Sequence, residues 1–357
     1  MTPKIIHPRR HAAHGRAAAR STVSGLTLVE LMIAMMLGLL VVGSASAIFI
    51  SNRATYRATE GLGRVQENGR MAFELMARDL REAGGNPCGN ADRKEPLKLV
   101  NVLNNPAAQW WTNWNNGIRG YEAAIPGGNP PGRVVGADAI DLMSADSSSA
   151  ATIADHDPDA TEFELNTADH GFRTSDLAIV CDWREASLFQ VTDADAGNSN
   201  RIEHANAGAA PGNCTKGLGY ANPAVCTAAG KKKQYGPNPA DNMASATIVR
   251  MQPVRWYVGT TANGGRSLFR SAVVNTAGVL AVTEQEIAEG VNDMEMQYLL
   301  EGAANYVDAT LIPANRWNDV TAVRVTLDML SADGAGMGGA QLQRRIAHTV
   351  TLRNRME

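Results

Sequence analysis

Residues 25–50 read GLTLVELMIAMMLGLLVVGSASAIFI, and Glu30 is the only ionisable side chain among them. A helix of about 20 apolar residues spans the hydrocarbon core of a bilayer, so this stretch predicts a membrane-spanning helix. Placing a carboxylate in such a helix costs roughly 2.5 to 3.5 kcal/mol even on lenient insertion scales. Glu30 is therefore a candidate functional residue.

The segment before this helix is basic. Residues 1–25 contain five Lys or Arg residues and no acid, so their removal changes the formal net charge from -3 to -8. The positive-inside bias keeps this end cytoplasmic and sends the rest of the chain across the membrane. An acidic remainder argues against nucleic acid as the principal partner. Residues 44–47 (Ser-Ala-Ser-Ala) imitate a signal-peptidase site, so ordinary signal cleavage is an alternative.

The start of the apolar stretch resembles a type IV prepilin, because Gly25, Leu26 and Glu30 have the spacing of that family's processing motif. The resemblance implies that an inner-membrane prepilin peptidase removes the leader, residues 1–25, and methylates the new amino terminus on Leu26. Most members of the family have Phe at the position of Leu26. A buried α-ammonium needs a partner, so we expect the Glu30 carboxylate to pair with it and to set the axial register of an entering subunit.

A long helix is predicted from Leu26 to Glu82. Its first part, residues 26–50, is the membrane span and later the filament core, whereas residues 51–82 are amphipathic, with apolar residues at three- and four-residue steps. Residues 84–87 (Gly-Gly-Asn-Pro) end it. The amphipathic part must pack on a sheet, because tertiary packing supplies most of the stability of such a helix.

Further segments resemble the PilW family of minor pilins, in order along the chain. They are residues 51–53, 56–57, 66–70, 77–81, 179–182, 188–192, 268–270, 287–294, 322–325 and 351–355. The resemblance implies a type IV pilin-like α+β fold, in which the long N-terminal helix packs on a mixed or antiparallel β-sheet head with long loops.

The head, residues 83–357, shows short strand patterns separated by Gly, Asp and Asn. The predicted strands are 139–144, 162–166, 176–181, 188–192, 246–251, 254–258, 267–273, 294–300, 319–330 and 345–353. We expect a short helix or turn at 284–293. Residues 193–245 lack periodicity and predict a variable surface loop, in which Lys231 to Lys233 form a solvated tip.

Four cysteines, Cys88, Cys181, Cys214 and Cys226, lie on the translocated side, where disulfides form. Four cysteines allow three pairings. We favour Cys214 with Cys226, which have 11 residues between them, and Cys88 with Cys181. Neither pair has the CxxC spacing of redox or zinc sites.

No catalytic, metal or cofactor site is predicted. Residues 334–339 satisfy GxGxxG but lack the strand–helix context of a dinucleotide site. The alternating aspartates at 155, 157 and 159, and at 193 and 195, have a spacing that suits calcium coordination by oxygen atoms. Neither segment has the Gly and Glu of an EF-hand loop. The cluster of Trp110, Trp111 and Trp114 either plugs a sheet edge or contacts a partner at the filament tip.

The resemblance implies a minor pilin without enzymatic activity, incorporated in the tip or priming complex that initiates pilus assembly. Its partners would be the prepilin peptidase, other minor pilins and the major pilin, with a tip adhesin as a further candidate. It would be anchored in the inner membrane with its head in the periplasm, then reach the cell surface in the pilus, in the service of adhesion or twitching motility. A type II secretion pseudopilin is one alternative. A signal-anchored periplasmic enzyme or binding protein is another.

Overall fold

A computed structural model describes residues 25–88, 98–106, 108–122, 125, 129–208, 210–219, 230–237, 245–331, 334 and 339–355. The chain divides between Thr55 and Tyr56 into two compact units. One helix, α1, extends from Leu28 to Glu82. The predicted end at Glu82 is confirmed, and the helix begins two residues after Leu26.

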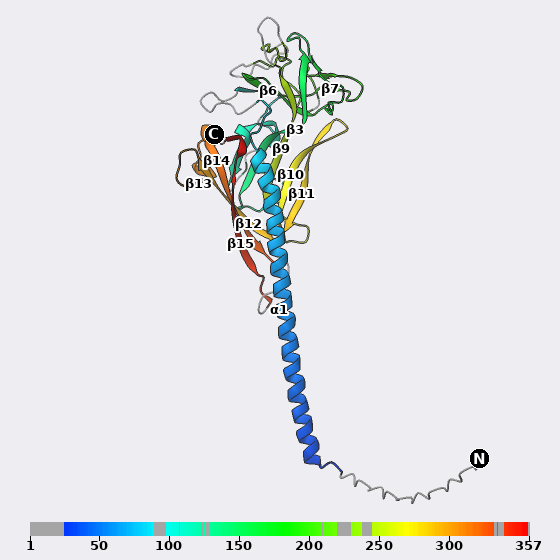
Figure 1. Ribbon diagram of the computed structural model, residues 1–357, viewed down its shortest axis with the longest axis vertical. Coiled ribbons are helices and arrows are strands. Elements are labelled where there is room, and N and C mark those ends of the chain that lie inside the picture. Colours follow the sequence, from blue (N-terminus) through cyan, green and yellow to red (C-terminus); the bar gives the residue numbers. More distant parts are fainter. Residues whose placement is uncertain are drawn as a thin grey trace, which may run out of the picture. The chain divides into compact units, whose positions relative to one another are not determined.

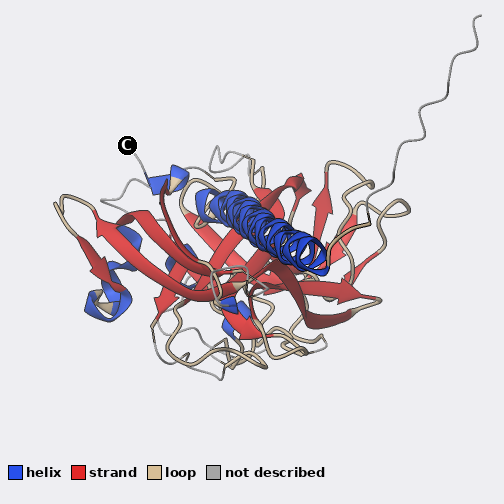
Figure 2. Ribbon diagram, turned by 90° about the horizontal axis from the view of Figure 1, so that it is seen from below, coloured by secondary structure: helices blue, strands red, loops and turns tan. Residues whose placement is uncertain are grey.

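In the second unit, one face of α1 is buried in the main core of the head. The buried residues are Val65, Gly69, Ala72, Met76, Ala77 and Leu80. Three- and four-residue steps place side chains on one side of a helix, so this stripe meets the sheets continuously. The core that it enters contains residues from two sheets, including Trp256 of one and Val323 of the other. Figure 2 shows strands beside the helix in a view close to its axis.

The larger sheet has 11 strands and is mixed. Its strands are β1 (Lys98–Asn101), β2 (Ile118–Tyr121), β3 (Ala139–Asp155), β4 (Glu162–Leu165), β5 (Leu177–Cys181), β6 (Glu185–Gln190), β7 (Asp193–Ala194), β8 (Arg201–Glu203), β9 (Thr247–Thr260), β10 (Arg266–Thr276) and β11 (Val279–Glu289). The main path is β1-β6-β5-β9-β3-β4-β8-β7, while β10 joins β9 to β11 and β2 pairs with β3. The β1–β6 pair is parallel.

The smaller sheet is antiparallel, in the order β13-β12-β14-β15. Its strands are β12 (Val291–Leu300), β13 (Tyr306–Asp308), β14 (Val320–Leu330) and β15 (Gln343–Thr351). The predicted final pair of strands is confirmed as β14 and β15 (Figure 1). Short 3₁₀ helices are η1 (Trp110–Thr112), η2 (Asn115–Gly117), η3 (Ala309–Leu311), η4 (Ala314–Asp319) and η6 (Arg353–Arg355). This arrangement is a pilin-like α+β fold.

Strand β9 continues through Pro253, across the gap between the predicted strands 246–251 and 254–258. Two strands were expected, on either side of Pro253, but β9 is continuous. On one edge, residues 247–257 pair with β3; on the other edge, residues 247–250 pair with β5 and residues 254–260 with β10. Pro253 falls between β5 and β10 on the second edge. A proline is tolerated at such a position, because no neighbouring strand needs the N–H that it lacks.

The expected helix or turn at 284–293 is wrong. Residues up to Glu289 belong to β11, and β12 starts at Val291 after a turn at Gly290, whose φ is +80°. The Glu-rich sequence suits a helix by intrinsic propensity. Pairing along β10, from Ser267↔Glu289 to Thr276↔Val279, overrides that preference.

Residues 193–245 are only partly the surface loop that was expected. They contribute β7 and β8 to the larger sheet, and Leu218 and Tyr235 are fully buried. Lys233 is not at a solvated tip, because its ammonium lies 2.6 Å from the buried carboxylate of Asp182. A buried carboxylate needs such a partner, so this ion pair holds the segment against the sheet.

Two buried histidines lie in a second core beside these residues. The rings of His156 and His204 have centroids 5.4 Å apart and both contact Phe163. The Nδ1 atom of His156 accepts a hydrogen bond from the backbone N–H of Tyr235 at 3.0 Å. This bond requires an unprotonated Nδ1, so the fold selects the neutral ring. Burial lowers the pKa of His156 to about 4 and that of His204 to about 3.

We therefore predict that replacing His204 by leucine makes the protein more acid-resistant. Both histidines are neutral when folded and protonated when unfolded below about pH 6.5, so the wild type loses stability between pH 6.5 and 4. Relative to wild type, His204→Leu should gain about 1 kcal/mol per pH unit over this window. Urea unfolding in detergent at pH 7.5, 5.5 and 4.5, followed by tryptophan fluorescence, measures the difference.

Asp138 changes the free energy of unfolding with pH in the direction opposite to the histidines, so the prediction concerns the difference between variant and wild type. Burial raises the pKa of Asp138 to about 7, so its contribution increases as pH falls towards the value of an unfolded aspartate. Both proteins contain Asp138, so its effect cancels. A difference that stays constant with pH would contradict the prediction.

Candidate functional site

The predicted processing motif lies at the start of α1. The Glu30 N–H donates to the Thr27 hydroxyl at 3.3 Å, and the Leu31 N–H donates to the Thr27 carbonyl at 3.1 Å. Thr27 is thus the N-cap, and Glu30 occupies the third helical position, as in a capping box. Gly25 and Leu26 are exposed and precede the helix. The motif is therefore accessible, with an acid in the first helical turn, where the helix dipole favours it.

The first unit leaves its apolar side chains uncovered. Large hydrophobic residues from Leu26 to Ile50 are between 54% and 76% exposed. In the described part of the chain, α1 is the one helix long and apolar enough to cross a membrane. A helix that is apolar all round is stable only in lipid or among other helices, so this part of α1 is consistent with a membrane anchor.

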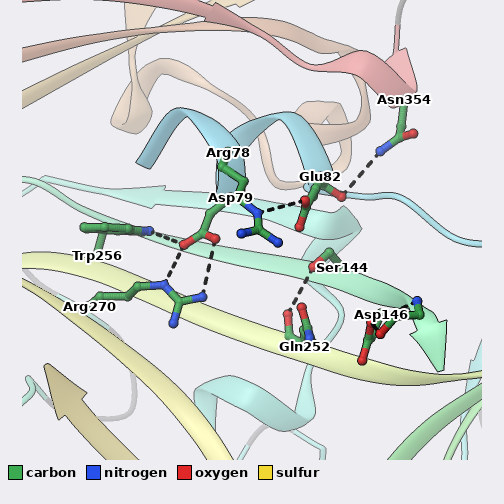
Figure 3. Close-up of polar contacts among 10 residues, drawn as sticks. Arg78, Asp79, Glu82, Ser144, Asp146, Gln252, Trp256, Arg270 and Asn354 are labelled. Atoms are coloured by element: carbon green, nitrogen blue, oxygen red, sulfur yellow. Dashed lines mark hydrogen bonds and ion pairs between the residues drawn. The ribbon is translucent and has the colours of Figure 1, made fainter. Parts of the chain in front are cut away.

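In the second unit, a single carboxylate of α1 receives hydrogen bonds from two strands (Figure 3). Asp79 accepts one from the indole N–H of Trp256, on β9, at 2.9 Å. It accepts two from the guanidinium of Arg270, on β10, at 2.7 and 3.3 Å. The Asp79 and Arg270 side chains are 14% and 28% exposed, so this pair is shielded from water and stronger than a surface ion pair.

The helix approaches the smaller sheet closely at Gly69. A Cβ atom there would lie 2.5 Å from Ile346 Cδ1 and 2.7 Å from Met329 Sδ. One turn further on, Phe73 stacks on His348 with ring centroids 4.1 Å apart. Gly69 therefore allows β14 and β15 to reach the helix backbone.

The C-terminal residues fasten the end of α1. The Asn354 amide donates to the carbonyl oxygens of Glu82 and Ala83, both at 3.4 Å. The Arg355 guanidinium donates to the carbonyl oxygens of Trp317 and Asn116. Helix ends leave carbonyl groups without intrahelical partners, so the Asn354 contacts replace water at the end of α1, whereas Arg355 links the C-terminal residues to η4 and η2.

A disulfide joins Cys88 and Cys181, whose Cα atoms are 5.8 Å apart. These are two residues that the sequence analysis paired. Cys214 is not free, and its expected partner Cys226 lies outside the described residues. Among the described residues, no group of three or more His, Cys, Asp or Glu side chains is placed to hold a metal ion.

Sequence reasoning missed the contacts of Asp79, Trp256 and Arg270. Asp79 belongs to residues 77–81, which resemble PilW, but the sequence assigned it no contact. It is the one acid next to the buried stripe position Leu80, and it lies between Arg78 and Arg81. An acid so close to the apolar stripe is a weak signal of a buried partner. The identity of that partner, 177 and 191 residues away, left no signal in the sequence.

The first part of α1 is apolar and exposed, and one face of its second part is buried against two sheets. This division of one helix defines a pilin-like protein. Residues 255–346 match the PilW family, described as Type IV Pilus-assembly protein W. The resemblance to PilW is thus confirmed over this part of the chain, which contains Trp256, Arg270, Met329 and Ile346 and so supplies much of the surface that receives α1. No curated protein matches the chain.

We predict that Asp79→Ala destabilises the head by about 2 to 3 kcal/mol, because it leaves Arg270 and the Trp256 N–H without their acceptor. Glu74→Ala is the matched control, since Glu74 pairs with Arg70 at 2.9 Å on the same helix but in water. That change should cost less than about 1 kcal/mol. Urea unfolding in detergent measures both. Equal losses would show that the Asp79 contacts add nothing beyond a surface pair.

Two glycine substitutions should have opposite signs. Gly69→Ala should destabilise by about 0.5 to 2 kcal/mol, because the overlap of the added methyl with Ile346 and Met329 outweighs the helix propensity that alanine adds. Gly63→Ala should stabilise by up to about 1 kcal/mol, because nothing lies within 4 Å of its Cβ position and alanine favours the helix. The same unfolding assay compares them, and stabilisation by Gly69→Ala would refute the close approach.

Proposed function

We propose that this chain is a minor subunit of a type IV pilus that joins the complex priming filament growth and then stays at the tip. The observation that carries the proposal is the division of α1: an exposed apolar part with Glu30 as its one acid, and a part fixed to a head that matches PilW over residues 255–346. The first part suits lipid and then a bundle of helices, whereas the second connects that bundle to the head.

In this proposal, cleavage after Gly25 creates an α-amine on Leu26, one residue before the N-cap Thr27. The Glu30 carboxylate, in the first turn, is then the acid closest in sequence to that amine. In an apolar bundle an unpaired charge is costly, so a subunit settles only where the amine and a carboxylate meet. The partners are the prepilin peptidase, other minor pilins and the major pilin, with a tip adhesin as a further candidate.

Priming explains why a cell needs such a subunit. The first helices of a filament have no neighbours to cover their apolar surface, so a preassembled cluster lowers the cost of starting. A head of this size suits the tip, where it need not stack repeatedly. The proposed role is structural and not enzymatic.

Complementation of a deletion strain tests the proposal. Without the gene, surface pili recovered by shearing should be lost or strongly reduced, whereas type II secretion should be unchanged. Normal piliation would contradict priming, and lost secretion would indicate a pseudopilin.

The mass of the intact protein tests the processing. The chain should begin at methylated Leu26 only when the peptidase is present. A start at Met1 or after Ala47 would contradict it.

Variants at two acids of α1 then isolate Glu30. Glu30→Ala should still be cleaved but should restore piliation at least about tenfold less well, since its lost pairing is worth more than 1.4 kcal/mol in an apolar medium. Glu60→Ala removes an acid from the exposed pair with Arg64 and should restore piliation fully. Equal complementation by both would refute the register role of Glu30.

A further inference from the structure

A polar row crosses the larger sheet on the face that α1 does not cover. Asp141 on β3 is opposite Arg255 on β9, Arg255 is opposite Ser271 on β10, and Ser271 is opposite Glu284 on β11. Directly opposed residues share a face, and consecutive residues alternate. The neighbouring residues Trp256 and Arg270 contact Asp79 of α1, so the row lies on the other face.

Arg255 and Asp141 form a buried, two-pronged ion pair. The Arg255 Nε and Nη2 atoms donate to the two Asp141 carboxylate oxygens at 2.5 and 2.8 Å, and both side chains are at most 4% exposed. The Cζ atom of Arg255 lies over the indole ring of Trp110, 4.6 Å from the ring centroid. This pair neutralises the charge of Arg255 but leaves Nη1 with hydrogen atoms that Asp141 does not accept.

A pocket of about 500 Å³ opens at this row. Its walls include Trp110, Pro130 and Pro131, and its polar lining includes Arg255, Ser271 and Glu284. The Ser271 side chain is almost fully buried, and its hydroxyl has no hydrogen-bond partner among the described residues. The Tyr257 phenol lies beside both this hydroxyl and the Glu284 carboxylate. A buried polar atom without a partner is costly, so the site favours a ligand that supplies one.

The charges and shapes of the lining define the ligand class. Asp141 cancels the charge of Arg255, and Glu284 adds a negative charge, so a phosphate or carboxylate gains little. The guanidinium donates, the Glu284 carboxylate accepts, and the Ser271 hydroxyl does both, which suits a ligand with several hydroxyl groups. Trp110 and the two prolines offer apolar surface to the C–H face of a ring.

We propose that this pocket binds a neutral saccharide, with Trp110 as the packing wall and Arg255, Ser271 and Glu284 as hydrogen-bonding groups. The site goes beyond the proposed role in pilus assembly and does not depend on it. Its volume is within the range of small-ligand pockets, and its position on a sheet face away from α1 leaves it separate from the contacts that hold the helix.

The test uses the full-length chain in a zwitterionic detergent, because glycoside detergents would compete for the site. Saturation-transfer NMR and calorimetry with glucose, galactose, N-acetylglucosamine, cellobiose, lactose and chitobiose measure binding. At least one of these sugars should bind at millimolar concentration. Trp110→Ala should weaken that binding at least about tenfold, and Ser271→Ala about three- to tenfold, as loss of one hydrogen bond implies.

Trp183→Ala is the matched control. Trp183 also carries an arginine over its ring, Arg184 at 4.2 Å, but it is 62% exposed and outside the pocket, so binding should not change. Glu284→Gln, on the exposed edge strand β11, replaces Trp110→Ala if that variant fails to fold, and should also weaken binding. Absence of binding by all six sugars, or binding that Trp110→Ala and Glu284→Gln leave intact in folded protein, would overturn the proposal.

Discussion

The structure depends on one carboxylate that holds a helix against two strands far from it in sequence. Asp79 lies beside the buried stripe of α1 and accepts hydrogen bonds from both β9 and β10. Apolar burial alone would tolerate small rotations of the helix and small shifts along its axis, because hydrophobic contacts are not directional. Hydrogen bonds to an indole and a guanidinium are directional, so they fix the rotation and height of α1 against the sheet.

The PilW match coincides with the surface that receives this helix. Residues 255–346 provide the Trp256 and Arg270 donors and the Met329 and Ile346 side chains that press against Gly69. The part of the head outside the match holds the second core with its buried histidines and the segment fastened by Lys233. The matched part therefore provides much of the surface that receives α1, to which His348 and Asn354 add contacts, and the rest extends the head.

The local features of this fold could be predicted from sequence, whereas its distant contacts could not. The apolar run, the stripe to Leu80 and the glycines after Glu82 predict α1, because periodicity and capping act over a few residues. The β-branched content of β14 and β15 likewise predicts a strand pair. By contrast, β11 has a helix-like sequence and is a strand only because β10 is beside it. The partners of Asp79, and the row from Asp141 to Glu284, depend on strand register, which no local pattern encodes.

The disulfide has a mechanical consequence. Cys88 follows the end of α1 by a few residues, and Cys181 ends β5, which lies between β6 and β9 in the larger sheet. Tension applied along the helix therefore enters the sheet through a covalent bond in its interior, and the stretch of chain between the two cysteines, 93 positions apart, is bypassed by the load. A pull on the helix is thereby passed to β5 and to the two strands hydrogen-bonded to it, β6 and β9.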